Sequence, residues 1–368
     1  MNFIPVLSTL ILIGCGGSGE RTETAEQPGP DTLRLVPADT IGVEMGDSAY
    51  VFGMILAAEA DRNGRTLVLD SHGCRLSAYD AEGVFIGSAG SRGSGPGELQ
   101  FPMDFAVLGD GGVVVNDLQL SRLSFYGPHM GHRRDLSGFF PTAPMFLGSF
   151  RDSLFAAVDM SIDMSADRPV VSARAGIWAP DSVGPTVTLA TLEQEAGPHT
   201  DSGEPAERLL MAASDSLVFV GYQSVDRFLV EVYDEEGNKV GEISRPWQRV
   251  EKTPEEMESS RGMAISVTRE SEGGSSTEAH SVENAVPWHN AIADLGCDSR
   301  GRLWVQLGSV RGRPTFEVYD PASGELVLCA VADSTLAGGM INVSPGGIVH
   351  FDPDPEDYPK VIRLELAE

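Results

Sequence analysis

Short apolar segments and turn-forming residues alternate along most of the chain in a fixed order. An apolar strand is followed by an Asp/Gly/Ser turn and then by a second apolar strand. Gly, Asn and Asp suit such turns because they tolerate a positive φ or cap the turn with a side-chain hydrogen bond. The pattern therefore predicts a series of antiparallel hairpins. Copies of this turn and its following strand lie at 61–69, 110–115, 152–156, 215–220, 298–305 and 345–351.

A second feature follows most of these copies: an apolar strand ending in an aromatic residue, then a Gly turn and a further strand. The clearest examples lie at 76–83, 123–131, 230–237 and 316–324. Four strands in a unit of about 40–45 residues are typical of propeller blades, whereas a β-sandwich lacks this fixed order. We therefore expect an all-β fold, a six-bladed β-propeller, with seven blades as the alternative.

The inner strand of each blade should be short and apolar, because the inner strands converge on a central channel. The last blade has strands at 348–351 and 361–366 but no outer strand of its own. An N-terminal strand at 32–36 or 40–43 should complete it and thereby remove an exposed sheet edge. Inner strands are expected at 55–60, 104–108, 145–149, 209–213, 291–296 and 340–343.

The residues around the second copy carry a family resemblance. Segment 93–102 reads Gly-Ser-Gly-Pro-Gly-Glu-Leu-Gln-Phe-Pro, and it precedes apolar strands at 104–107 and 113–115 and the Arg-Leu-Ser-Phe-Tyr run at 122–126. This stretch resembles an NHL-type repeat, and it is similar to the bacterial six-bladed propeller lipoproteins related to that family. The resemblance covers 32–368, most strongly 61–126. It implies a fold rather than an activity, because these propellers carry many functions.

Two insertions interrupt the period, at about 161–188 and 245–284. The second should contain a short helix at 254–261, where Thr253 can cap the helix and two glutamates suit its positive end. Long insertions of a propeller emerge from one face and either carry function or lack order.

The N-terminal residues have the pattern of an export signal followed by a linker. An apolar run at 3–13 is too short to span a bilayer as a helix, and it ends in Leu12-Ile13-Gly14-Cys15. This order resembles a bacterial lipoprotein signal, in which the cysteine receives diacylglycerol. We expect 1–15 to be the signal peptide with lipidation at Cys15, 16–31 a flexible linker and 32–368 the propeller. The protein should then be exported and anchored in the cell envelope; a residue other than Asp after Cys15 favours the outer membrane.

The charge of the chain indicates which partners to exclude, and the positions of the cysteines indicate whether they can form disulfides. The net charge is −28, from 54 acidic and 26 basic residues, and this repels nucleic acid. Contact with a membrane is expected only through the lipid anchor.

Apart from Cys15 the chain has Cys74, Cys297 and Cys329, and the last two should lie on the inner and outer strands of one blade. That separation exceeds disulfide reach, so we expect buried free thiols.

Any binding or catalytic site should lie at the mouth of the channel, where the inner strands begin. Asp104 is delivered there, and so are Trp288, His289 and Asn290 at the end of the second insertion. Some propeller hydrolases and lyases hold Ca²⁺ in the channel with carboxylate and amide oxygens and use a nearby His as base. Asp104 and Asn290 could bind Ca²⁺ in this way, and His289 could act as the base. A structural role at the rim is the stronger interpretation of all four residues.

The sequence lacks a nucleophile elbow, a phosphate-binding glycine loop and a redox cysteine pair. We therefore expect a non-catalytic module, anchored in the cell envelope, that acts as a binding or scaffold protein for a protein, peptide or glycan. The alternative is a Ca²⁺-dependent propeller hydrolase or lyase with its site at the central channel.

Overall fold

The computed structural model describes residues 31–367, apart from gaps at 140–142, 152–153, 164, 166–169, 196–205, 255, 258–264, 272–273, 281–285, 309–313 and 337–338. The signal peptide, Cys15 and nearly all of the linker that the sequence predicts lie outside these residues. Residues 31–368 form one compact unit. The described part is built from β-strands, and none of its helices is long and apolar enough to cross a membrane.

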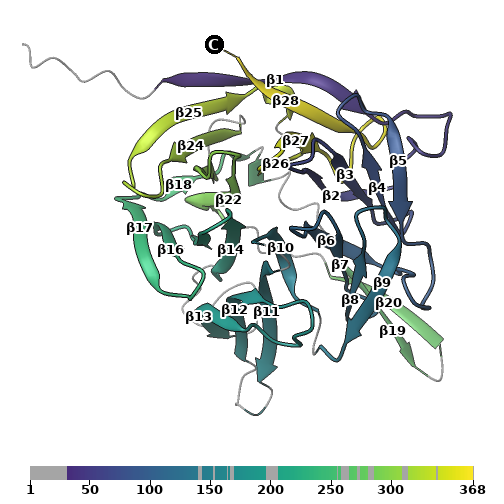
Figure 1. The fold of residues 1–368 in the computed structure, drawn as a ribbon. Helices are drawn as coiled ribbons and strands as arrows, with labels where there is room; N and C mark the ends of the chain where they lie inside the picture. The colour runs from purple at the N-terminus through teal and green to yellow at the C-terminus, as the bar shows by residue number, and fades with distance from the viewer. Residues whose placement is uncertain are drawn as a thin grey trace, which may run out of the picture. The chain divides into compact units, whose positions relative to one another are not determined.

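Four antiparallel sheets of four strands each follow one another along the chain (Figure 1). In each sheet the strands pair in sequence order, so that every connection is a hairpin. The sheets are β2 (Ile55–Ala60), β3 (Thr66–Asp70), β4 (Arg75–Tyr79) and β5 (Phe85–Ala89); β6 (Pro102–Val107), β7 (Val113–Asp117), β8 (Arg122–Tyr126) and β9 (His132–Ser137); β10 (Met145–Ser149), β11 (Phe155–Asp163), β12 (Val170–Trp178) and β13 (Val187–Glu195); and β14 (Arg208–Ala213), β15 (Val218–Gln223), β16 (Phe228–Tyr233) and β17 (Lys239–Arg245).

A fifth sheet has eight strands and contains both the first and the last strand of the described chain. In spatial order its strands are β22 (Ile292–Cys297), β23 (Leu303–Leu307), β24 (Thr315–Tyr319), β25 (Leu326–Ala332), β1 (Thr32–Ile41), β28 (Val361–Ala367), β27 (Gly347–Phe351) and β26 (Met340–Ser344).

The predicted count of six blades is wrong, and so is the alternative of seven. Strand β1 pairs in parallel with β25, where Leu35 lies opposite Ala332, and antiparallel with β28, where Ile41 lies opposite Val361. This double pairing fuses strands expected to form two blades into one eight-stranded sheet. The propeller thus consists of four four-stranded blades and one large, nearly closed sheet.

The strands nearest the centre lie side by side in a ring (Figure 1). Strands β2, β6, β10 and β14 contact one another in that order, and β22 and β26, the two ends of the large sheet, fill the space between β14 and β2. The expected inner strands agree with these six to within two residues at each end. They follow from the short apolar runs in the sequence, since turn residues delimit each run.

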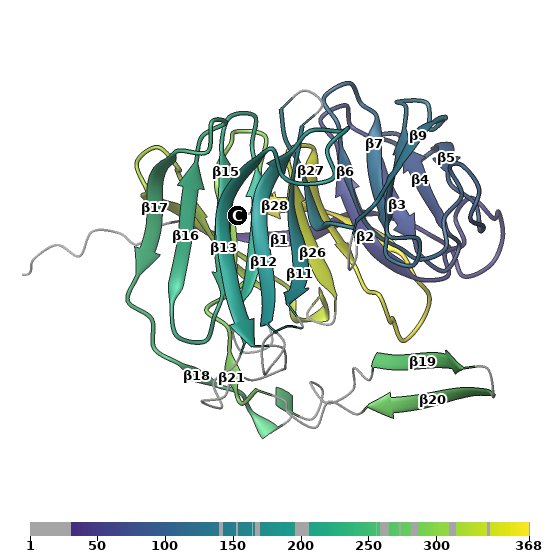
Figure 2. The same ribbon diagram turned by 90° about the horizontal axis from the view of Figure 1, so that it is seen from below.

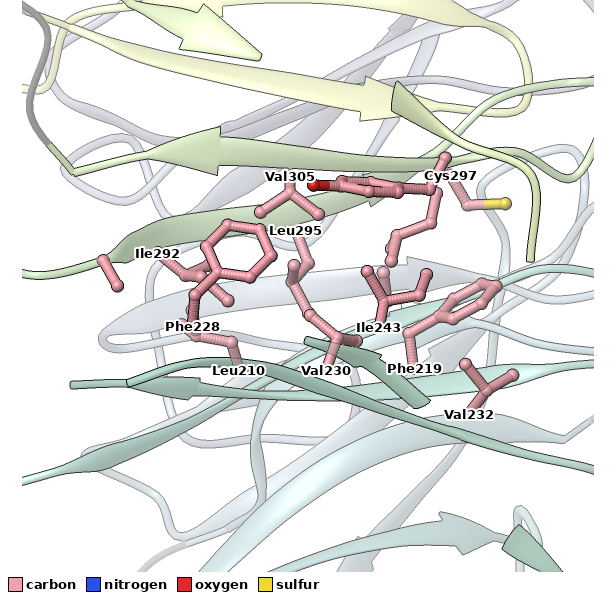
Figure 3. Close-up of a cluster of buried hydrophobic side chains, with 14 residues drawn as sticks. Leu210, Phe219, Phe228, Val230, Val232, Ile243, Ile292, Leu295, Cys297 and Val305 are labelled. Carbon is pink, nitrogen blue, oxygen red and sulfur yellow. The ribbon is translucent and has the colours of Figure 1, made fainter. Parts of the chain in front are cut away.

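Hydrophobic clusters fill the spaces between neighbouring sheets. Figure 3 shows one of them, in which Leu210, Phe219 and Phe228 from the β14–β17 sheet meet Ile292 and Leu295 of β22. Another cluster lies inside the eight-stranded sheet, where Leu35 of β1 packs with side chains of β23–β28. The large sheet therefore folds around its own core, and every sheet of the ring buries both of its faces.

The first predicted insertion, residues 161–188, belongs to the third blade and covers the end of β11, all of β12 and the beginning of β13. The second insertion contains β18 (Val250–Glu251), which pairs with β21 (Trp288–His289), and the hairpin of β19 (Ile265–Ser271) and β20 (Gly274–His280) (Figure 2). Of the helix expected at 254–261, residues 254, 256 and 257 are helical, and the other positions lie outside the described residues. Thr253 and Glu256 cap each other through reciprocal hydrogen bonds. A short 3₁₀ helix, η1 (Ser334–Leu336), precedes β26.

The three described cysteines are free, as the sequence predicts. Cys297 lies in β22 and Cys329 in β25, with two strands between them. Cys74 and Cys297 are buried, whereas Cys329 is only half-buried.

We predict that Leu35→Ala destabilises the folded protein by about 2–4 kcal/mol, measured by urea unfolding. Leu35 is 1% exposed and belongs to the core inside the eight-stranded sheet, so truncation leaves a cavity next to the strand that joins both halves of that sheet. The matched control is Leu326→Ala at the exposed beginning of β25, for which we expect a loss under about 1 kcal/mol. Equal losses in both variants would contradict a closing role for β1.

Candidate functional site

A cavity of about 570 Å³ occupies the centre of the ring. Residues of β2, β6, β10, β14, β22 and β26 line it, so that the four blades and the eight-stranded sheet all contribute to its wall. Its size is in the range of small-molecule sites in proteins. The channel is thus the place where side chains from distant parts of the sequence converge.

Asp104 lies in this cavity because of a β-bulge. The pairing of β6 with β7 shifts between Pro102 and Asp104, and such a bulge redirects the side chains of the strand. One Asp104 oxygen accepts a hydrogen bond from the Phe105 amide at 2.8 Å, and the other accepts one from the Leu147 amide at 2.8 Å. Burial raises the pKa of Asp104 to about 7, although both hydrogen bonds favour the charged form.

Asp294 occupies the corresponding position in β22. The pairing of β22 with β23 also shifts just before it, between Ile292 and Asp294. Its Oδ1 accepts a hydrogen bond from the Leu295 amide at 2.9 Å. Burial raises the pKa of Asp294 to about 6, and its charge in turn raises the pKa of Asp104. The negative charges of the two carboxyl groups therefore repel each other across the channel.

Glu59 of β2 is the third carboxyl group of the channel, and it is only 8% exposed. Its Oε1 accepts a hydrogen bond from the Ser149 hydroxyl at 3.3 Å. Burial raises the pKa of Glu59 to about 8; the Ser149 hydrogen bond opposes this rise, and the negative charges of Asp104 and Asp61 add to it. Glu59 and Ser149 also line a second cavity of about 400 Å³ next to the turns at Asp61 and Asp215, so they lie between the two cavities.

The rest of the channel wall combines amides with exposed apolar side chains. Gln223, Gln306 and Asn342 line it, and the side chains of Gln223 and Asn342 donate to the backbone oxygens of Ala293 and Ala58. Phe146 is 44% exposed, and its φ of 54° is unusual for a residue with a bulky side chain. The apolar residues of the wall include Met103, Met145, Phe146, Leu147, Met211 and Met340.

Of the site residues proposed from the sequence, the structure places Asp104 in the channel and the other three elsewhere. His289 pairs with Val250 in the small β18–β21 sheet, and its Nε2 lies 3.2 Å from the carboxylate of Glu256. The guanidinium carbon of Arg249 lies 5.7 Å from the centroid of the Trp288 ring. Asn290 is half-buried and directly follows β21. Among the described residues that line the channel cavity, none is a histidine.

Sequence reasoning missed Glu59 and Asp294. A signal for both was present, because each is an acidic residue inside an otherwise small and apolar inner strand, Ile-Leu-Ala-Ala-Glu-Ala and Ile-Ala-Asp-Leu-Gly-Cys. Lys, Glu, Arg and Asp are almost never fully buried unless paired, so an acid in such a strand deserves a functional hypothesis. The described residues contain no group of three or more His, Cys, Asp or Glu side chains that could hold a metal ion.

The described sheets and their central channel define the protein as a β-propeller. No protein-family model matches the chain, and no curated protein matches its sequence.

Several solved structures resemble the chain in fold. A DUF4221 member from Bacteroides vulgatus has 12% identity and a TM-score of 0.49, over 92% of this chain and 100% of the other. A gluconolactonase from Xanthomonas campestris has 11% identity and a TM-score of 0.44, over 93% and 99%. The virginiamycin B lyase of Staphylococcus aureus has 11% identity and a TM-score of 0.44, over 90% and 99%. Matches at this level of identity concern the fold alone.

We predict that Glu59→Gln makes the protein more stable above pH 8 and flattens the dependence of its stability on pH. Because the pKa of Glu59 rises from 4.5 to about 8 on folding, the folded state keeps a proton that the unfolded chain releases. The stabilising contribution is therefore complete below pH 4.5 and is lost as the pH rises to about 8. Gln cannot ionise, and we expect a gain of roughly 2–4 kcal/mol above that range.

The measurement is urea unfolding at several pH values between these limits, with the exposed Glu82→Gln as the control variant. A pH profile of Glu59→Gln that runs parallel to the wild-type profile would show that Glu59 does not ionise with the shifted pKa.

Proposed function

We propose that the protein is an envelope-anchored binding module and that its ligand enters the central channel. The observation that carries this proposal is the cavity of about 570 Å³, into which three strands deliver carboxyl groups and others deliver amides. Buried polar groups normally have partners inside the protein. Here a bound small molecule, or the projecting end of a peptide or glycan, would supply the missing ones.

Binding fits this geometry better than the Ca²⁺-dependent hydrolase or lyase does. That alternative needs His289 and Asn290 near Asp104, yet in the structure His289 bonds to Glu256 and does not line the cavity. Among the described residues, the one hydroxyl that bonds to a channel carboxyl group is that of Ser149. It donates to Glu59 at 3.3 Å and also accepts a hydrogen bond from the Val107 amide.

The location in the cell envelope is supported by sequence features outside the described residues. The run that ends in Leu12-Ile13-Gly14-Cys15 has the order of a bacterial lipoprotein signal, and 16–31 would form the linker. The element at 93–102 supports a relation to the NHL-type propeller lipoproteins. We propose lipidation at Cys15 and residence at the outer membrane on these grounds.

We predict that Ala293→Trp abolishes ligand binding without unfolding the protein. Ala293 is half-buried in the cavity wall, and an indole there would occupy the channel. The measurement is thermal unfolding of the wild type and the variant with a panel of amines, amino acids, peptides and sugars. We expect that some compounds raise the wild-type melting temperature by mass action and leave that of Ala293→Trp unchanged.

The control for this experiment is Ala322→Trp in the exposed turn after β24, which should retain every shift. Equal shifts in Ala293→Trp and the wild type would place binding outside the channel, and a panel without any effect would also count against the proposed function.

We predict that Cys15→Ser abolishes incorporation of labelled palmitate and releases the protein from the membrane fraction of bacteria expressing the whole chain. Serine lacks the thiol that accepts the lipid, whereas the control Cys329→Ser alters a half-buried thiol of β25. We expect that control to label like the wild type. Membrane association and labelling that persist in Cys15→Ser would contradict the anchor.

A further inference from the structure

We propose that the channel binds an organic cation, an ammonium or guanidinium group on an apolar body, with the charged group beside the carboxyl groups that line the cavity, those of Glu59, Asp104 and Asp294. This inference rests on the proposed function, because it assumes that the channel is the binding site. It adds the chemical class of the ligand.

The three carboxyl groups retain hydrogen-bonding capacity that the protein does not use. Within the described residues, Oδ2 of Asp294 and Oε2 of Glu59 have no hydrogen-bond partner. The second oxygen of each carboxyl group, Oδ1 of Asp294 and Oε1 of Glu59, accepts a single hydrogen bond. Asp104 accepts two backbone amides, and a carboxylate offers about four lone-pair sites. Glu59 is more than nine-tenths buried and lines both the channel cavity and the second cavity, so a ligand would reach its free oxygen through one of these two spaces. An ammonium or guanidinium group has several N–H donors and could satisfy such free acceptors.

No cation of the protein pairs directly with the channel carboxyl groups. Among the described ion pairs none involves Glu59, Asp104 or Asp294, although Arg208 lines the same cavity and the charge of Arg62 lowers the pKa of Glu59. Carboxyl groups removed from water without a cation are costly, and they respond by taking up protons. The raised pKa values of all three groups agree with this account. A cationic ligand would replace those protons, and the net charge of −28 would attract it.

The apolar part of the wall argues for an organic cation over a metal ion. Calcium takes six to eight oxygen ligands, whereas no three acidic or other metal-binding side chains of the described chain converge on one point. Exposed Phe146 and Met340 line the cavity together with Met103 and Met145. Flexible methionines adapt to varied apolar shapes, and an aromatic ring can also contact a cation through its face. An alkyl or aromatic amine matches both parts of this surface.

The test is isothermal titration of the full chain with 2-phenylethylamine, its neutral analogue 2-phenylethanol and the anion 3-phenylpropanoate. Mildly alkaline buffer keeps Asp104 and Asp294 ionised and the amine protonated. We expect the amine to bind at least about tenfold more tightly than the alcohol, a difference of about 1.4 kcal/mol in binding free energy. The acid should not bind. We expect Asp294→Asn to reduce that preference to less than about threefold, because Asn keeps the acceptor for the Leu295 amide but loses the charge.

Two further variants make the result specific. Glu59→Gln should also reduce the preference for the amine over the alcohol. It provides a second test of the carboxyl groups if Asp294→Asn does not fold. Asp354→Asn makes the same charge change at an exposed position and should bind like the wild type.

The outcomes separate this inference from the proposed function. If amine and alcohol bind equally and Ala293→Trp abolishes the binding of both, the ligand need not be a cation, and this inference is wrong. The channel would still be the binding site. An amine preference unchanged in Asp294→Asn and Glu59→Gln would overturn the assignment to these carboxyl groups, and so would the absence of amine binding to the wild type. Binding lost equally in Asp354→Asn would point to general charge attraction and would also overturn it.

Discussion

The double pairing of β1 is the constraint on which the rest of the ring depends. Each sheet of the propeller has two apolar faces, and each face is buried against a neighbouring sheet or, inside the large sheet, against the other half of the same sheet. A ring of this kind is stable when it closes, since an open ring exposes two apolar faces and two sheet edges. Strand β1 hydrogen-bonds to β25 on one side and to β28 on the other, so the beginning and the end of the described chain are held in one sheet.

Closure also determines what the channel can contain. When the ring is complete, the innermost strands are forced close together, and their contacts leave little room for side chains. Gly296 illustrates this limit, because a Cβ there would lie 2.5 Å from the backbone oxygen of Val343. At two places a bulge changes the direction of the strand just before an acidic residue of the cavity, namely before Asp104 and before Asp294. The same bulges give each aspartate the amide of the following residue as a hydrogen-bond donor.

The sequence predicted local structure well and long-range pairing poorly, for a physical reason. Turn residues and apolar runs located the strands around Ile55–Ala60 and Met145–Ser149 to the residue, because hairpin register is set by nearby positions. The number of blades came out wrong because it depends on whether β1 takes one partner or two, and only tertiary contacts decide that. Asp104 was identified because it starts an inner strand after a proline. Glu59 and Asp294 were missed because a single acidic residue does not change the assignment of an otherwise apolar segment to a core strand.

The three channel carboxyl groups are best understood as a stability cost that binding would offset. Glu59, Asp104 and Asp294 all hold protons more tightly in the folded protein than in the unfolded chain, so each destabilises the fold near neutral pH. Ring closure does not need them, because the neighbouring strands β10 and β14 pack at the channel with no acidic residue of their own. Groups that weaken a fold and face a cavity together are expected where a ligand supplies their missing partner. The same carboxyl groups that cost the fold stability would therefore gain from a bound cation.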